Sequence, residues 1–407
     1  MHEIGHALGL EHPFEGTNQL ATAQNYTNYT IMSYTHPDGV WFDGNYLISS
    51  TPMVYDIAAI QHLYGAATYN DGNTTYAYDP SKPFAEAIWD SGGYDTLDLS
   101  NFIKACTINL TPGDYSTIVC TDWSMADNLG IAFGTTIEEV IGGSGNDIIT
   151  GNSADNVLYG SAGDDLLVGG AGDDTLYGGD GDDTLNGGEG NDTLYASLGA
   201  DIEDGGDGID TYIIRDTLTY IPVIDLKLET AYLQGSTPDF SNSVANIENV
   251  TMLGDSAVEI IGSDGANTLI GAGGADTLKG GAGNDTLNGQ AGNDNIYAGP
   301  GNDTLTGGPG ADTFHFYYGD GVNTITDWND DEDNIILYGL DGLEIDSSVV
   351  TATSNSLNEV VYTLTDGTSL TLKNVKVPLA ESIGALSVVN SGTSTAPVLD
   401  FYLDSSK

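Results

Sequence analysis

The sequence predicts a mostly β protein with a small α-containing N-terminal part, two parallel β-roll blocks and a C-terminal β region. Three observations carry this prediction. A nonapeptide rich in glycine and aspartate recurs with an aliphatic residue in phase, short β-like runs flank the repeats, and a histidine-bearing helical segment opens the chain. The chain has 407 residues, which is enough for several domains.

The net charge of −52 indicates a protein that binds cations. Such a chain repels nucleic acid and anionic membrane surfaces, so neither is an expected partner. A content of 40% hydrophobic residues with 23 tyrosines argues against a disordered acidic chain. No apolar run approaches the ~20 residues that a membrane span needs, so we expect no membrane insertion. Nothing in the sequence indicates an oligomer, and we expect a monomer.

The nonapeptides fall into two blocks. Residues 142–213 divide into eight and residues 262–315 into six, with the consensus Gly-Gly-x-Gly-x-Asp-x-Leu-x. The first six positions predict a turn whose glycines permit positive φ, and the last three predict a short strand with its aliphatic side chain inward. Because successive strands fall on opposite sheets, two nonapeptides make one coil. A flexible Gly/Asp linker, the alternative, would not keep an aliphatic residue in phase.

Each pair of turns, in repeats i and i+2, offers carboxylate and carbonyl oxygens to one calcium ion, which gives an upper count of about ten structural sites. The expected ligands are Asp147, Asp165, Asp174, Asp183, Asp192, Asp201, Asp210, Asp276, Asp285, Asp294, Asp303 and Asp312. Asn156 and Asn267 replace the aspartate in two repeats, where we expect weaker binding.

Residues 2–12 carry a zinc-binding pattern, His-Glu-Ile-Gly-His-Ala-Leu-Gly-Leu-Glu-His. On a helix, His2 and His6 lie one turn apart and can bind one zinc ion, while Glu3 can take a proton from the attacking water. Gly9 can adopt positive φ and turn the chain, so that His12 returns as a third ligand. Three protein ligands leave one position open, which is typical of catalytic zinc. The fixed offsets of Gly9 and His12 disfavour the alternative, a helix with surface histidines.

The pattern H-E-x-x-H-x-x-G-x-x-H is the metzincin signature, and the N-terminal part resembles the serralysin family. The resemblance implies that Met32 forms the methionine turn beneath the histidines, and that Tyr34 ligates zinc or stabilises the oxyanion. Residues 56–66 resemble the last helix of that catalytic domain, with Gly65 at its cap. The nonapeptides resemble those of repeats-in-toxin proteins. Together these resemblances imply a secreted, extracellular zinc endopeptidase that acts on proteins or peptides and is exported by the type I secretion machinery.

Residues 89–96 resemble the calcium-binding turn that opens the C-terminal domain of serralysins. This resemblance implies two further calcium ions. The first is surrounded by Asn70, Gly72, Thr74, Asp90, Gly92 and Asp95. The second is surrounded by Gly93, Asp95, Thr136 and Glu138.

The expected domains follow from these assignments. They are the C-terminal half of a metzincin catalytic domain (1–66), a calcium-binding β connection (67–141), the first β-roll block (142–213), a β linker (214–261), the second β-roll block (262–315) and a capping or secretion β region (316–407). The family has a β-sheet with a substrate-aligning strand before the zinc helix. This sequence has no counterpart of it, so we expect a truncated catalytic domain and a fragment.

Three alternatives stay open. One is a calcium-dependent extracellular binding or surface protein with an inactive zinc site, and another is a repeats-in-toxin enzyme of different chemistry, such as a polysaccharide-modifying one. The third concerns Cys106 and Cys120, which flank a Thr-Pro-Gly-Asp turn. They would form either a disulfide across a hairpin or two buried free thiols.

Overall fold

The computed structural model places the chain in two compact units, Met1–Gly208 and Ile209–Lys407. The residues it describes are 2–12, 29–33, 41–42, 45–46, 49–122, 126–197, 199–215, 222–233, 241–317, 319–329, 331–338, 351–354, 360–363, 369–373, 386–390 and 398–403.

The N-terminal part of the first unit is helical and small. It contains α1 (His2–Ala7), α2 (Val54–Tyr64) and an antiparallel pair, β1 (Trp41–Phe42) with β2 (Asn45–Tyr46). The predicted helix over 56–66 is therefore present, beginning two residues earlier. It ends at Gly65, whose φ of 82° and bond from its N–H to the Gln61 carbonyl, at 2.8 Å, confirm the expected cap. Met53 and Val54 form a buried cluster with Ala87 that anchors α2 to the β structure.

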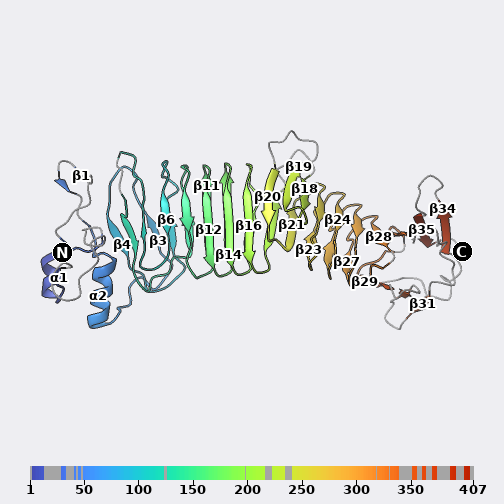
Figure 1. The fold of residues 1–407 in the computed structure, drawn as a ribbon, viewed down its shortest axis with the longest axis horizontal. Helices are drawn as coiled ribbons and strands as arrows, with labels where there is room; N and C mark the ends of the chain where they lie inside the picture. The colour runs from blue at the N-terminus through green and yellow to red at the C-terminus, as the bar shows by residue number, and fades with distance from the viewer. Residues whose placement is uncertain are drawn as a thin grey trace. The chain divides into compact units, whose positions relative to one another are not determined.

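Two parallel sheets form the roll of the first unit (Figure 1). The first contains β3 (Thr75–Ala77), β5 (Thr96–Asp98), β9 (Glu139–Ile141), β11 (Val157–Ala162), β13 (Thr175–Asp180) and β15 (Thr193–Tyr195), in that order. The second contains β6 (Thr107–Asn109), β10 (Ile148–Thr150), β12 (Leu166–Ala171), β14 (Thr184–Glu189) and β16 (Ile202–Asp207). A smaller sheet has the order β4 (Glu86–Ile88), β8 (Leu129–Ile131), β7 (Tyr115–Ser116).

Strand register confirms that two nonapeptides make one coil. Leu158 pairs with Leu176 on one sheet and Leu167 pairs with Leu185 on the other, and all four side chains are fully buried. Several strands are longer than predicted: β11 to β14 and β16 have six residues rather than three. The extra length arises because glycines of the following turn continue the ladder, as Gly170 does with Gly188.

The second unit also contains two sheets. One has the order β17 (Thr211–Arg215), β21 (Asn249–Leu253), β23 (Thr268–Ile270), β25 (Thr286–Asn288), β27 (Thr304–Thr306), β29 (Val322–Ile325), β33 (Ser369–Leu372), β32 (Val360–Thr363), β31 (Thr351–Ser354). The other has the order β20 (Ser241–Ala245), β19 (Thr230–Leu233), β18 (Pro222–Asp225), β22 (Glu259–Ile261), β24 (Thr277–Lys279), β26 (Asn295–Tyr297), β28 (Thr313–Tyr317), β30 (Asn334–Tyr338), β35 (Val398–Leu403), β34 (Leu386–Asn390).

Antiparallel strands flank the parallel ladder of this unit, as β18–β19–β20 and as β30–β35–β34. The β structure expected over 214–261 and after the second block is therefore present. None of the helices in the described parts of the chain is both long and apolar enough to cross a membrane.

The two cysteines are buried free thiols. A bridge between Thr107 and Thr117 confirms the expected hairpin, but no disulfide closes it. The Cys106 thiol contacts the Lys104 carbonyl at 3.4 Å, whereas the Cys120 thiol contacts the Lys82 carbonyl at 3.3 Å. Burial raises the pKa of Cys106 to about 11, which keeps this thiol protonated and unreactive.

Candidate metal centres

Two of the predicted zinc ligands converge after α1. Gly9 has a φ of 92°, which turns the chain back as expected and brings His12 beside His6. Their Nε2 atoms lie 3.2 Å apart, and the His6 Nδ1 lies 3.0 Å from the Leu10 carbonyl. Two nitrogens bound to one tetrahedral zinc lie about 3.3 Å apart, so this pair fits a shared ion. The bond to Leu10 leaves the His6 Nε2 available as the metal-facing nitrogen.

Met32 packs against α1 at Gly5, where the family resemblance implies a methionine turn. It is 2% exposed, and a methyl group at Gly5 would overlap its sulfur. The glycine inside the histidine pattern therefore has a physical reason: it lets the methionine turn approach the helix backbone. The side chains of His2 and Glu3, and the whole of Tyr34, lie outside the described residues, so their predicted roles stay predictions.

Asp56 ties the methionine turn to α2. Its buried carboxylate accepts hydrogen bonds from the Ile31 and Met53 N–H groups, at 2.8 and 2.9 Å, and from the Thr30 hydroxyl. Three donors thus depend on one side chain. The sequence signal for this role is the position of Asp56, because an acidic residue at the third position of a helix commonly bonds the cap.

Replacing Asp56 with alanine is expected to destabilise the N-terminal part by about 3 kcal/mol, because it leaves three donors unsatisfied, two of them in the backbone. Thermal unfolding monitored by near-ultraviolet circular dichroism measures the change. Asp122→Ala, at an exposed aspartate, is the control and should leave the midpoint nearly unchanged. Equal midpoints for the two variants would contradict the assigned role of Asp56.

The first of the two calcium sites implied by resemblance is also partly assembled. Asp90 and Asp95 are buried, and the Asp95 Oδ1 accepts the Thr74 N–H at 2.8 Å. A methyl group at Gly93 would overlap the Gly72 carbonyl, so these two turns are in close contact. Tyr76 links Asn70 to Asp90. Its hydroxyl donates to the Asp90 carboxylate at 2.7 Å and accepts from the Asn70 amide at 3.2 Å. Tyr76 was not predicted; it positions a candidate ligand without being one.

The second implied site shares Asp95. The Asp95 N–H donates to the Glu138 carboxylate at 2.7 Å, which brings these two predicted ligands together. Thr136 is exposed, two residues before Glu138. The Asp95 Oδ2 has no hydrogen-bond partner among the described residues, and burial, with the nearby charges of Asp90 and Glu138, raises its pKa to about 6. A buried carboxylate of this kind fits a bound cation.

The repeat aspartates form ladders along the roll. In each ladder the N–H of one aspartate donates to the Oδ1 of the aspartate 18 residues later, as from Asp147 to Asp165 and from Asp165 to Asp183. The second block repeats this arrangement from Asp276 to Asp294 and from Asp294 to Asp312. All twelve predicted aspartates are at most 3% exposed.

The second oxygen of many of these carboxylates is buried without a protein donor. This holds, among the described residues, for the Oδ2 atoms of Asp165, Asp174, Asp183, Asp285, Asp294, Asp303 and Asp312. At four of these turns a glycine lies close to both the Oδ2 and a backbone carbonyl: a methyl at Gly160, for example, would overlap both the Asp165 Oδ2 and the Gly178 carbonyl oxygen. Convergent buried oxygens without donors are what a calcium ion requires, so these turns fit the ion.

Some turns differ from this pattern. The Oδ2 atoms of Asp147 and Asp276 accept N–H groups of Gly143 and Ala272, at 2.9 and 2.7 Å. The Asp201 Oδ2 accepts the Ser197 hydroxyl at 3.1 Å. The same nonapeptide places Glu203, 1% exposed, at the inward position where an aliphatic residue was predicted. The sequence consensus therefore overstates how uniform the turns are.

Burial and mutual repulsion disfavour the charged carboxylates when calcium is absent. Burial, followed by the charges of neighbouring aspartates, raises the pKa of Asp174, Asp183 and Asp303 to about 7. The pKa of an aspartate in an unfolded chain is about 3.9. A raised pKa in the folded state means that ionisation costs stability.

The calcium-free roll is therefore expected to be more folded at pH 5 than at pH 8. The penalty is absent below about pH 4, grows as the pH rises, and is complete above about pH 7. Calcium must displace the same protons, so its affinity should fall as the pH is lowered through this window. Far-ultraviolet circular dichroism in calcium-depleted buffer measures the first effect, and calcium titration measures the second. A calcium-free β signal that increases with pH would contradict the assignment.

Comparisons with known proteins support the calcium-binding repeats. A family model described as the RTX calcium-binding nonapeptide repeat (4 copies) matches residues 141–176, 177–212, 261–296, 279–314 and 288–325. Serralysin C of Dickeya chrysanthemi is 43% identical over 171 residues, covering 36% of this chain and 34% of the relative. Serralysin of Proteus mirabilis is 37% identical over 175 residues, covering 37% and 34%. Metallopeptidase AprA of Pseudomonas marginalis is 38% identical over 183 residues, covering 37% and 36%.

The chain thus spans about a third of the length of these curated relatives in its matched part. Among solved structures, the extracellular lipase LipA from Serratia marcescens gives a TM-score of 0.22 at 21% identity, covering 58% of this chain and 38% of that one; a score this low establishes no shared fold. Within the described residues, no group of three or more His, Cys, Asp or Glu side chains forms a ready metal site. The matched residues show that this chain carries RTX calcium-binding repeats, and over about a third of its length it is similar to proteins named serralysin and metallopeptidase AprA.

Proposed function

We propose that the chain is the zinc-binding and calcium-binding part of a secreted zinc endopeptidase. The observation that carries the proposal is the pairing of His6 and His12, whose Nε2 atoms lie 3.2 Å apart after the turn at Gly9. The support of Met32 beneath Gly5 adds to it. The names of the relatives, serralysin and metallopeptidase, agree with this chemistry.

The proposed roles follow from the donor set. His2, His6 and His12 would hold the zinc ion, with Tyr34 as a further ligand or as a hydrogen-bond donor to the oxyanion. Bound zinc supplies a Lewis acid for peptide hydrolysis. Glu3 takes the proton of the attacking water and passes it to the leaving amine. Protein or peptide segments are the proposed substrates.

The proposed role of calcium is to fold the roll outside the cell. In calcium-poor cytosol, folding would bury aspartates that repel one another, and this cost keeps the chain unfolded for the type I secretion machinery. Extracellular calcium modules bind at roughly 10⁻⁴–10⁻³ M, so the roll would fill and fold after export. The proposed ions are one catalytic zinc and several structural calciums.

Glu3→Ala is expected to lower casein hydrolysis by at least about 100-fold while zinc stays bound, because the variant removes the general base and no ligand. The assay is run with calcium and zinc on this chain and on any longer protein that the gene encodes, with zinc content measured alongside. Glu11→Ala changes an exposed carboxylate of the same segment and should keep activity within about twofold.

Full activity in Glu3→Ala would refute this mechanism. A wild-type protein that holds zinc and calcium but hydrolyses no protein would instead favour the alternative, an extracellular binding or surface protein with an inactive zinc site.

A further inference from the structure

The two asparagines that replace repeat aspartates make contacts of a different kind from the aspartates. The Asn156 Nδ2 donates to the carbonyls of Ile137, at 3.1 Å, and Glu138, at 3.3 Å. The Asn267 Nδ2 donates to the Glu248 carbonyl at 2.8 Å. In both cases the acceptor belongs to the segment that immediately precedes the stacked repeats on that side.

An aspartate could not make these contacts. At the corresponding place in the ladders, the Oδ1 of Asp165 or Asp174 accepts a backbone N–H from the turn below. Below Asn156 and Asn267 the chain presents carbonyl oxygens instead, so a carboxylate there would set oxygen against oxygen at hydrogen-bond distance. The amide group donates to these carbonyls, whereas a carboxylate would need a cation between the opposed oxygens.

The remaining oxygen of each asparagine is also bonded within the protein. The Asn156 Oδ1 accepts the Asn152 N–H at 2.8 Å, and the Asn267 Oδ1 accepts the Ser263 N–H at 2.8 Å and the Ser263 hydroxyl at 3.1 Å. The aspartates with an unpartnered Oδ2, such as Asp285, lack this closure. The side-chain oxygen of each asparagine is therefore already engaged within the protein.

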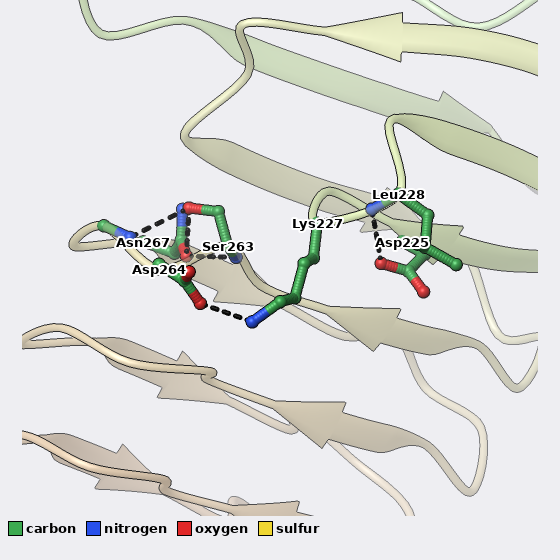
Figure 2. A network of polar contacts seen from close by, with 7 residues as sticks. Asp225, Lys227, Leu228, Ser263, Asp264 and Asn267 are labelled. Atoms are coloured by element: carbon green, nitrogen blue, oxygen red, sulfur yellow. Dashed lines mark hydrogen bonds and ion pairs between the residues drawn. The ribbon is translucent and has the colours of Figure 1, made fainter.

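A lysine side chain from elsewhere in the chain forms an ion pair with the turn at Asn267 (Figure 2). The Lys227 ammonium group, from the segment between the repeat blocks, lies 2.6 Å from the Asp264 carboxylate in that turn. The chain has only eight basic residues. The pair is exposed and adds little stability by itself, but it places positive charge at a turn where calcium would otherwise supply it.

We propose that the turns 151–156 and 262–267 are calcium-free end caps, in which the asparagine amide takes the place of the ion. Each cap completes its coil without calcium. The next coil still receives the usual ladder hydrogen bond, because the N–H groups of Asn156 and Asn267 donate to Asp174 and Asp285 as those of repeat aspartates do. This proposal is the alternative to the expectation of two weakened calcium sites. The inference rests on the proposed calcium binding by the other turns.

The test is the sign of the stability change in Asn156→Asp and Asn267→Asp at saturating calcium. If the asparagines are caps, each variant loses an amide donor and buries opposed oxygens, so the thermal midpoint should fall by about 5 °C with no increase in bound calcium. If they are weakened calcium ligands, the variants restore the consensus, and the midpoint or the calcium count should rise. The rise would overturn the proposal.

Asn284→Asp is the matched control, because it adds the same charge at an exposed turn position, where the side chain accepts the Asn302 N–H with an oxygen that aspartate keeps. It should leave the midpoint within about 1 °C. Failure of Asn156→Asp to fold in calcium, while Asn284→Asp folds, also supports the caps, since the rival predicts stabilisation. Counting bound calcium by mass spectrometry separates failure of the cap proposal from failure of the proposed function. A wild-type chain that binds no calcium would refute the proposed calcium binding itself.

Discussion

In calcium-free buffer at pH 8 the chain is expected to lose most of its β-sheet circular dichroism and to regain it when calcium returns to about 1 mM. The reason lies in the aspartate ladders. There the backbone N–H of Asp165 donates to the Oδ1 of Asp183, and the Oδ2 atom of each of these two residues is buried without a donor. Without cations, ionised groups in this arrangement are desolvated and repel each other. Magnesium at the same concentration should restore less signal, because it demands a tighter octahedral geometry.

A pair of substitutions makes this first prediction specific. Asp183→Ala removes a buried ladder carboxylate, and we expect the calcium concentration at half-refolding to rise several-fold. Asp180→Ala removes an exposed carboxylate three residues away and should leave that midpoint unchanged. A roll that keeps its full β signal without calcium, or equal midpoints for the two variants, would show that the ladders are not metal ligands.

The second large effect is expected at the zinc centre. His6→Ala should weaken zinc binding by more than about 100-fold, because it removes one ligand together with its hydrogen bond to the Leu10 carbonyl, which orients the ring. Competition with a chromophoric chelator measures the affinity. His62→Ala is the control, since His62 lies exposed on α2 away from the pattern.

Equal zinc affinities in these two variants would contradict the assignment of His6. A His6→Ala variant that binds no zinc yet retains the wild-type far-ultraviolet spectrum would confirm that the loss is local. That result is expected, because the repeats and not the zinc helix supply most of the secondary structure.

Periodicity made the roll predictable from sequence. A nonapeptide with one inward aliphatic residue fixes the strand spacing, the alternation between sheets and the buried column that contains Leu158 and Leu176. The spacing of the histidine pattern likewise predicted the turn at Gly9, because a third ligand can return only if the helix ends there.

Other features depend on contacts between segments that are distant in sequence. The bond from Thr30 to Asp56, and that from Tyr76 to Asp90, join residues whose pairing no local pattern indicates. The Cys106 and Cys120 spacing fitted a hairpin, but spacing alone does not specify whether two thiols bond, and both stay free, each against a different carbonyl acceptor.

The asparagines show what a consensus leaves out. The repeat predicts that Asn156 and Asn267 are weaker calcium ligands, but it does not show that carbonyl oxygens lie beside their amide groups. Glu203 is a related case: its phase predicted an aliphatic side chain, and the structure buries a carboxylate there. In both cases the departure from the repeat marks a place where the environment of the coil changes.

The most direct test of the calcium assignment is the metal content of the purified chain after dialysis against calcium at pH 8, measured by inductively coupled plasma mass spectrometry. The seven turns whose aspartates have an unpartnered buried oxygen predict at least about seven calcium ions per chain. Two or fewer ions per folded chain would contradict the account, because most of the buried carboxylates would then be stabilised by something other than calcium.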